Sequence, residues 1–250
     1  MKINWEINEL DINKVKSFYD VHRENDFVII RKEKNINKIG INLSNESHWI
    51  VLISCLLTTQ QRSGPNSKVN NFLSTKPFPL SLNECLDAKS LGKFCESKLK
   101  LFGGIRRSET IGKELENNLA ILRENNWNLI SEINAELQNS DKYKLERKWS
   151  LLLSDKLMGI GPKQSRNYLQ MLGLTKYETP LDSRIMKWLN EFGFPVHLSA
   201  AGLADHQYYN FVMDGFRALC LKSDIYPCLM DAAIFSSFDE GGWTRENSVF

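Results

Sequence analysis

The chain has no long hydrophobic run. Its longest apolar stretch covers residues 49–57, which is well short of the roughly 20 residues that a helix needs to cross a bilayer. We therefore expect this stretch to be a buried helix, and we expect no membrane partner. The first residues carry acidic side chains and no apolar centre, so they do not resemble a signal peptide. These features predict a cytoplasmic location.

Cysteine is scarce, odd in number and widely scattered. None of the five cysteines forms a C-x-x-C pair, the spacing that is common in zinc sites and redox motifs. Scattered thiols fit a reducing compartment. The four histidines also lack the spacing of metal ligands, so the sequence predicts no metal site.

Neither sign of charge is in clear excess. The chain has 32 Lys and Arg against 30 Asp and Glu, a formal net charge of +2. This balance does not by itself indicate a nucleic-acid partner, so any surface for DNA must be local. Residues 89–113 carry seven basic side chains against two acidic ones. This segment either follows a phosphate backbone or is a solvated basic face.

Strand signals are almost absent, whereas helical periodicity is common. Only residues 27–31 have the β-branched density of a strand, and we allow for a short strand pair near 26–43. Apolar residues recur at helical spacing in five segments: 45–61, 110–123, 145–153, 185–192 and 212–220. A chain of 250 residues with 42% hydrophobic side chains can bury a sizeable core. We therefore predict an all-α fold.

Residues 157–161 are predicted to form a tight hairpin between two helices. Gly159 and Gly161 permit a positive φ and a close approach of the backbone. Pro162 suits the first turn of the following helix, where its missing N–H costs nothing. The exposed amides at the start of that helix can bind an anion such as a phosphate. The alternative is an ordinary helical corner with a glycine-rich loop.

A lysine and an aspartate flank this second helix. Lys163 follows the hairpin directly, and Asp182 precedes an amphipathic segment that ends at Gly193. Taken alone, Lys163 reads as a solvated lysine, the commonest state of this residue. Asp182 taken alone reads as an N-cap. A capping carboxylate is also held in a fixed direction, which suits a catalytic acid.

Together these residues carry a family resemblance. The string L-M-G-I-G-P-K-Q-S, followed by P-L-D-S-R, resembles the helix-hairpin-helix Gly/Pro-Asp motif of the endonuclease III and 8-oxoguanine DNA glycosylase superfamily. The resemblance implies that the hairpin, within about 146–173, grips the DNA backbone. It also implies that Lys163 is the nucleophile of a bifunctional glycosylase and that Asp182 is the second catalytic group.

Weaker similarities extend over about residues 45–240. The stretch L-I-S-C-L-L-T-T-Q-Q resembles the early family helix that ends near the lesion, and it places Gln60 where a glutamine fills the gap in the duplex. A solvated glutamine at a helix end is the alternative. The chain lacks the four clustered cysteines of the endonuclease III branch. We therefore expect no iron–sulfur cluster, while carbonyls of the hairpin can hold a monovalent cation in this family.

Further contacts with DNA follow from the same resemblance. We expect Gly159, Gly161, Gln60, Arg166 and Arg184 to touch the DNA. An extruded base needs an aromatic or apolar platform. The candidates for this platform are Trp49, Trp188, Phe235 and Trp243.

The resemblance implies two helical subdomains with an active-site cleft between them. Residues 49–175 would form one subdomain, and residues 1–48 with 176–250 the other. The implied activity is a monomeric bifunctional DNA glycosylase and AP lyase acting on double-stranded DNA with a damaged base. Among lesions 8-oxoguanine is favoured, with oxidised pyrimidines or another modified base as the alternative. A helix-hairpin-helix protein that binds DNA without catalysis is the alternative of a different class.

Overall fold

A computed structural model of the chain describes residues 4–238 and 242–246. Within those ranges all regular secondary structure is helical, which confirms the predicted all-α fold. The elements are α1 (Glu9–His22), α2 (Asp26–Arg31), a π-helical turn η1 (Lys32–Ile36), α3 (Asn45–Leu57), α4 (Lys68–Leu73), α5 (Leu82–Asp87), α6 (Leu91–Phe102), α7 (Ser108–Glu124), α8 (Asn128–Leu137), α9 (Tyr143–Lys156), α10 (Pro162–Met171), α11 (Ser183–Phe192), a 3₁₀ turn η2 (Gly202–Ala204), α12 (His206–Lys222) and α13 (Pro227–Ser237). Of the helices in these ranges, none has the length and apolar character that a membrane span requires.

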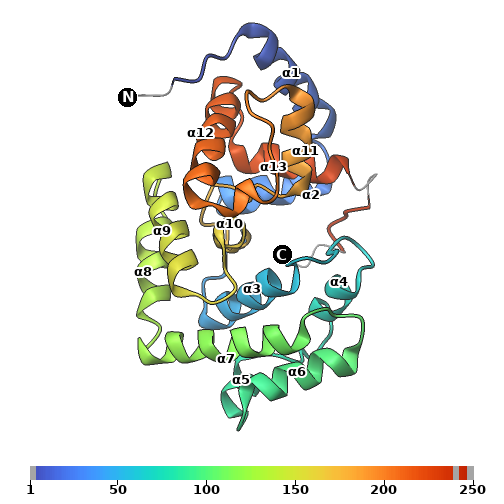
Figure 1. Cartoon of the computed structure of the whole chain (residues 1–250), viewed down its shortest axis with the longest axis vertical. Coiled ribbons are helices and arrows are strands. Elements are labelled where there is room, and N and C mark those ends of the chain that lie inside the picture. The colour runs from blue at the N-terminus through green and yellow to red at the C-terminus, as the bar shows by residue number, and fades with distance from the viewer. Residues whose placement is uncertain (1–3, 239–241, 247–250) are drawn as a thin grey trace.

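Two hydrophobic cores organise these helices. One core is formed by buried residues between positions 49 and 174, from α3 to α10. The other combines Val15 of α1 with buried residues between positions 181 and 234. Figure 1 shows the two groups of helices one above the other along the long axis, with α10 between them.

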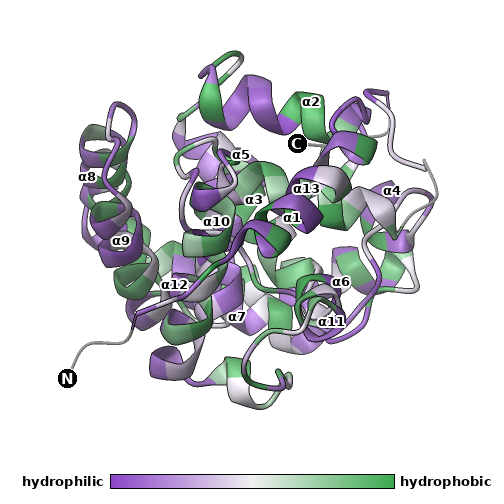
Figure 2. Ribbon diagram, turned by 90° about the horizontal axis from the view of Figure 1, so that it is seen from above, coloured by the Kyte–Doolittle hydropathy of each residue, from purple (hydrophilic) through white to green (hydrophobic). Residues whose placement is uncertain are grey.

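Helix α3 runs through the first core. It starts at a capped end, because the Ser44 side chain accepts a hydrogen bond from the Ser47 amide at 3.2 Å. Its residues from His48 to Leu57 are nearly all buried, and Figure 2 shows α3 as mainly hydrophobic beside the mixed colouring of α9. The expected buried helix is thus present, although it ends at Leu57 rather than near residue 61.

The strand expected at residues 27–31 is wrong. These residues belong to α2, which begins where the Asn25 side chain accepts a hydrogen bond from the Phe27 amide at 2.9 Å. The helix continues directly into η1. Its β-branched side chains pack against another helix, since Val28 forms a small core with Ala232 and Ala233 of α13. Tertiary packing overrides the local strand preference here.

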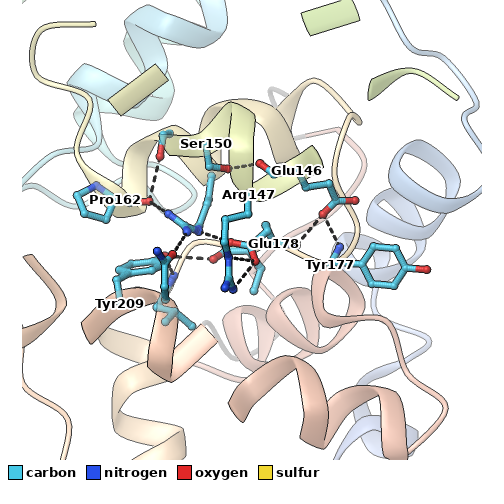
Figure 3. Close-up of polar contacts among 12 residues, drawn as sticks. Glu146, Arg147, Ser150, Pro162, Tyr177, Glu178 and Tyr209 are labelled. Carbon is cyan, nitrogen blue, oxygen red and sulfur yellow. Dashed lines mark hydrogen bonds and ion pairs between the residues drawn. The ribbon is translucent and has the colours of Figure 1, made fainter. Parts of the chain in front are cut away.

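A buried carboxylate joins three helices to the segment between α10 and α11. Glu178 is completely buried, and it receives hydrogen bonds from Arg147 of α9, Arg166 of α10 and Arg217 of α12. The donor–acceptor distances are 2.8 Å in each case. Figure 3 shows the Arg147 side chain next to Glu178. We refer to Glu178 and its three arginines as the Glu178 cluster.

A second buried carboxylate holds the backbone of the same segment. Glu146 accepts hydrogen bonds from the amides of Lys176, Tyr177 and Glu178, at 3.0, 2.8 and 2.7 Å. Burial raises the pKa of Glu146 to about 7. The three amides stabilise its ionised form and so oppose that rise.

The Glu178 cluster fixes the two candidate catalytic residues relative to each other. Arg166 lies one turn after Lys163 on α10, and its guanidinium also donates to the Pro162 carbonyl at 2.9 Å. Glu178 lies four residues before Asp182. The Arg166–Glu178 ion pair therefore connects the start of α10 to the start of α11 across the loop.

Replacing Glu178 by Gln should destabilise the fold strongly. The change leaves three guanidiniums facing a neutral amide, and an uncompensated buried charge costs about 3–5 kcal/mol. Urea unfolding followed by circular dichroism measures the loss. The exposed Glu132→Gln variant is the matched control and should stay within about 0.5 kcal/mol of the parent. Equal stability of the two variants would show that the Glu178 cluster does not hold the fold.

Candidate functional site

The hairpin between α9 and α10 depends on one glycine with a positive φ. Gly159 has a φ of +79°, and a Cβ atom at this position would lie 2.7 Å from side-chain atoms of both Glu114 and Leu56. Gly161 has a φ of −83°, and a Cβ there would meet nothing within 4 Å. Of the two glycines that permit a positive φ, Gly159 adopts one and Gly161 does not. Pro162 occupies the first turn of α10 as predicted.

Helix α7 supports the hairpin from below. The Asn118 side chain accepts from the Met158 amide at 2.7 Å and donates to the Met158 carbonyl at 2.9 Å. The Glu114 side chain packs directly against Gly159 and forms an ion pair with Arg107 at 2.8 Å. Sequence reasoning did not identify Asn118. The available signal was a polar residue on the same helical face as Leu115, Leu119 and Leu122.

The start of α10 is tied to the end of α3. Gln164 donates to Thr59 at 2.9 Å and to Thr58 at 3.3 Å. Gln61 extends the connection, because its side-chain oxygen accepts from the Arg106 amide at 3.0 Å. The hairpin, the loop after α3 and the loop before α7 are thereby held side by side.

These loops line a groove of about 1120 Å³. Its lining includes the hairpin glycines, Gln60 and the start of α11. Five of the lining residues are basic and one, Asp182, is acidic; the basic ones are Arg62, Lys68, Arg106, Lys163 and Arg184. The groove therefore concentrates positive charge that the whole chain lacks.

A smaller cavity of about 140 Å³ adjoins the groove. Its walls come from α2, η1, α3, α4, α10 and α13, together with Trp243 near the end of the chain. Lys163, Asp182 and Arg184 line both the cavity and the groove. The two candidate catalytic residues thus stand where the cavity meets the basic groove.

Lys163 is half-buried in the first turn of α10. No hydrogen bond or ion pair to its ammonium is found among the described residues. Its charge is close enough to oppose the effect of burial on two neighbours, the Cys55 thiol and the Asp231 carboxyl. The side chain is therefore held near acidic groups without being locked to one of them.

Asp182 is the N-cap of α11, as predicted. Its Oδ1 accepts from the amides of Arg184 and Ile185, at 2.8 and 3.1 Å. Its Oδ2 lies 3.2 Å from the Arg184 guanidinium, and 16% of the side chain is exposed. The cap fixes the direction of the carboxylate, which leaves Oδ2 turned toward Arg184 at the cavity mouth.

Asp231 of α13 is a cavity residue that sequence reasoning missed. Its Oδ2 accepts from Gln170 at 2.6 Å and pairs with Arg31 at 3.3 Å. Burial raises its pKa to about 7, although Arg31 opposes the rise. The only sequence signal was an acidic residue in an otherwise apolar helix.

Two of the four predicted aromatic platform residues line the cavity. Phe235 and Trp243 do so, with ring centroids 5.6 Å apart, and Phe27 stacks on Phe235 at 4.9 Å. The Arg184 guanidinium lies over the Phe235 ring at 4.1 Å. The cavity therefore has an aromatic wall beside its polar groups.

The platform prediction is wrong for the other two tryptophans. Trp49 is fully buried in the first core and donates its indole N–H to the Leu80 carbonyl at 3.1 Å. Trp188 packs against Phe18 and Phe192, and it lines neither the cavity nor the groove. Both residues serve packing.

The C-terminal tail after α13 contributes to the wall of the cavity. Residues 242–246 are described, and within them Trp243 is only 8% exposed. Arg245 pairs with Glu33 of η1 at 2.7 Å. The rest of the tail lies outside the described residues. The described part closes one side of the cavity.

The predicted DNA contacts divide into accessible and buried residues. Arg166 is completely buried in the Glu178 cluster, so its predicted contact with DNA is wrong. Gln60 is exposed, lines the groove and has a φ of +60°, an unusual conformation that occurs often at functional sites. Gly159, Gly161 and Arg184 also line the groove.

The basic segment 89–113 meets the groove at one basic residue, Arg106. Others in this segment pair locally, since Lys100 contacts Glu96 and Lys113 contacts Glu109 at 2.7 Å along their helices. Arg107 pairs with Glu114 under the hairpin. The alternative of a solvated basic face describes most of this segment.

Among the described residues, no three His, Cys, Asp or Glu side chains gather as metal ligands. Two hairpin carbonyls already accept hydrogen bonds, that of Met158 from Asn118 and that of Leu157 from the Ile160 amide at 3.3 Å. A monovalent cation here would have to use their second lone pairs. Such a cation stays a prediction.

The chain shares its fold with 8-oxoguanine DNA glycosylases of known structure. An 8-oxoguanine glycosylase/lyase of Methanocaldococcus jannaschii, crystallised with a 15mer DNA containing 8-oxoguanine, matches with a TM-score of 0.66 and 17% identity. The match covers 96% of this chain and 99% of that one. For the 8-oxoguanine DNA glycosylase of Thermotoga maritima the TM-score is 0.63 and the identity 16%, over 92% of this chain and 96% of that one.

No protein-family model and no curated protein matches the chain. The structural likeness nevertheless confirms the resemblance found in the hairpin sequence at the level of the fold. The chain has the same fold as these 8-oxoguanine DNA glycosylases of known structure.

Asp231 should impose a pH dependence on stability. Its pKa in the folded chain, about 7, lies above the ordinary value of 3.8. The folded chain therefore retains a proton that the unfolded chain releases, and the free energy of unfolding falls as pH rises from about 4 to about 7. Urea unfolding across this pH range should show a smaller fall in Asp231→Asn. An unchanged slope would contradict the raised pKa.

Proposed function

We propose that this protein is a bifunctional DNA glycosylase and AP lyase that removes an oxidised base from double-stranded DNA. One observation carries the proposal: Lys163 and Asp182 both line a cavity with an aromatic wall and the basic groove that adjoins it. A protein that only binds DNA needs neither the cavity nor this pair. The proposal treats the protein as a monomer that acts wherever the cell keeps its DNA.

The groove is suited to a duplex and the cavity to a single extruded base. The five basic side chains of the groove can contact phosphates, and the free amides at the start of α10 can bind one more. The lesion nucleotide rotates out of the stack into the cavity, where Phe235 and Trp243 offer aromatic surfaces. Exposed Gln60 is placed to occupy the gap left in the duplex.

Lys163 is the nucleophile in this scheme. Its uncharged amine attacks C1′ of the extruded nucleotide, and the glycosidic bond breaks with its electron pair leaving on the base, which takes up a proton. The amine loses a proton, the sugar ring opens and a Schiff base forms between Nζ and C1′. Removal of a C2′ proton then expels the 3′ phosphate, so the strand is cut by β-elimination.

Asp182 supports the first of these steps. The sugar becomes cationic as the base departs, and a carboxylate held by its helix cap can stabilise that charge without reorganising. The same group can take or give a proton as the ring opens. Arg184 pairs with Oδ2, which helps to hold this oxygen in position at the cavity mouth.

We favour 8-oxoguanine as the lesion. The support is the fold shared with 8-oxoguanine glycosylases, together with a sequence that lacks the cysteine set of the iron–sulfur branch. Oxidised pyrimidines are the alternative. A panel of duplexes, each with a different oxidised base, distinguishes them by which base is released fastest.

Borohydride trapping tests the role of Lys163. Reduction of the Schiff base should join the wild-type protein covalently to a duplex that contains 8-oxoguanine, and Lys163→Gln should form no adduct because it lacks the amine. Lys142→Gln, an exposed lysine at the start of α9, is the matched control and should be trapped as well as wild type. An adduct with Lys163→Gln would place the nucleophile elsewhere. No adduct with wild type would favour DNA binding without lyase chemistry.

Asp182→Asn tests the carboxylate without removing the helix cap. Asparagine caps helices about as well as aspartate, so the melting temperature should change little. Base removal in a single turnover should slow by about 100-fold or more, because the neutral amide cannot stabilise a cationic sugar. Asp205→Asn, which alters the cap of α12, should retain the wild-type rate. Normal base removal by Asp182→Asn would exclude Asp182 from the mechanism.

A further inference from the structure

One cation in the cavity has no assigned role. Lys34 of η1 is half-buried and lines the cavity. Its stem lies against the end of α10, where Gly173 has a φ of +77° and a Cβ would come within 3.0 Å of the Lys34 Cγ. The missing side chain at Gly173 leaves the room that the Lys34 stem occupies.

Three other cations nearby are bonded, and Lys163, whose ammonium also lines the cavity, already has the role of nucleophile in the proposed function. Arg31 pairs with Asp231, Lys38 donates to the Gly173 carbonyl at 2.7 Å, and Arg245 pairs with Glu33. For the Lys34 ammonium, no hydrogen bond or ion pair is found among residues 4–238 and 242–246. Burial and the nearby Arg31 charge lower the pKa of Lys34 to about 8, so most molecules carry the charge at neutral pH. A half-buried ammonium without a hydrogen-bond acceptor carries a free-energy cost of desolvation. This cost indicates that a bound ligand supplies the acceptor.

We propose that Lys34 is a specificity-determining residue that donates a hydrogen bond to a carbonyl oxygen of the extruded base. This inference rests on the proposed function. An ammonium only donates, so it matches an exocyclic oxygen and not an amino group. Its charge also repels a base that is itself cationic, such as an N-alkylated purine. The residue therefore selects neutral bases that carry a carbonyl group.

The lining of the same cavity also supplies acceptors. The Asp231 carboxylate lines it, and Asn35 has a buried side-chain oxygen without a hydrogen-bond partner in the described chain. Oxidised bases present a carbonyl next to an N–H group. Lys34 can donate to the carbonyl group of such a base, and Asp231 or Asn35 can accept from the neighbouring N–H group.

The test uses Lys34→Met, which keeps a long apolar stem against Gly173 and removes the ammonium. Binding is measured in the Lys163→Gln background, so that no turnover occurs, on two duplexes: one with 8-oxoguanine and one with a tetrahydrofuran abasic analogue. Loss of one hydrogen bond to a charged donor should weaken binding to the 8-oxoguanine duplex by about 10-fold to 100-fold. Binding to the abasic duplex, which places no base in the cavity, should not change. Lys32→Met, an exposed lysine of the same turn, should alter neither.

Each outcome decides between specific alternatives. Equal losses on both duplexes would show that Lys34 binds the sugar-phosphate backbone, and no loss on either would show that it touches nothing on the DNA; both results overturn the inference. A duplex with cationic 7-methylguanine should bind Lys34→Met at least as well as it binds the parent, and weaker binding would contradict the charge argument. If wild type releases no damaged base and Lys163→Gln does not prefer damaged DNA, the proposed function itself fails. If wild type releases a damaged base and Lys163→Gln prefers damaged DNA, but adding Lys34→Met to Lys163→Gln changes binding to neither duplex, only this inference fails.

Discussion

The ion pairs of Arg166, Arg147 and Arg217 with Glu178 are the constraint on which the site depends. A buried carboxylate that faces three guanidiniums is expensive to separate, and here it links α9, α10 and α12 to one short loop. The nucleophile candidate lies one turn before Arg166 on α10, and the carboxylate candidate lies four residues after Glu178 in the sequence. The relative position of Lys163 and Asp182 at the cavity mouth is thereby set by ion pairs that are themselves away from the substrate.

The site consists of a hairpin supported by side chains of other helices and a cavity lined by aromatic and polar groups. Asn118 and Glu114 of α7 hold the hairpin, and Gln164 fixes the start of α10. The cavity that opens there combines aromatic rings with Asp231 and Lys34. In the proposed function the basic side chains of the groove supply most of the attraction for DNA, because a chain with a net charge of +2 has little general attraction for it.

Local features of the site were readable from the sequence, while long-range ones were not. The first-turn proline of α10 and the capping role of Asp182 follow from residues within a few positions. Arg166 was misassigned to DNA because only Glu178, across a loop, determines that it is buried. Trp49 and Trp243 are alike in sequence terms, yet one fills a core and the other lines the cavity. The short helix α2 was taken for a strand because its packing against α13 is not visible locally.

The central claim is that a damaged base enters the cavity beside Lys163 and Asp182. A crystal structure of the Lys163→Gln variant bound to a duplex with 8-oxoguanine tests it most directly. We expect the lesion to be rotated out of the helix, in contact with Phe235 and Trp243, with its C1′ beside residue 163 and the hairpin against the DNA backbone. A lesion that stays stacked in a duplex bound along the groove, with the cavity empty, would contradict the account.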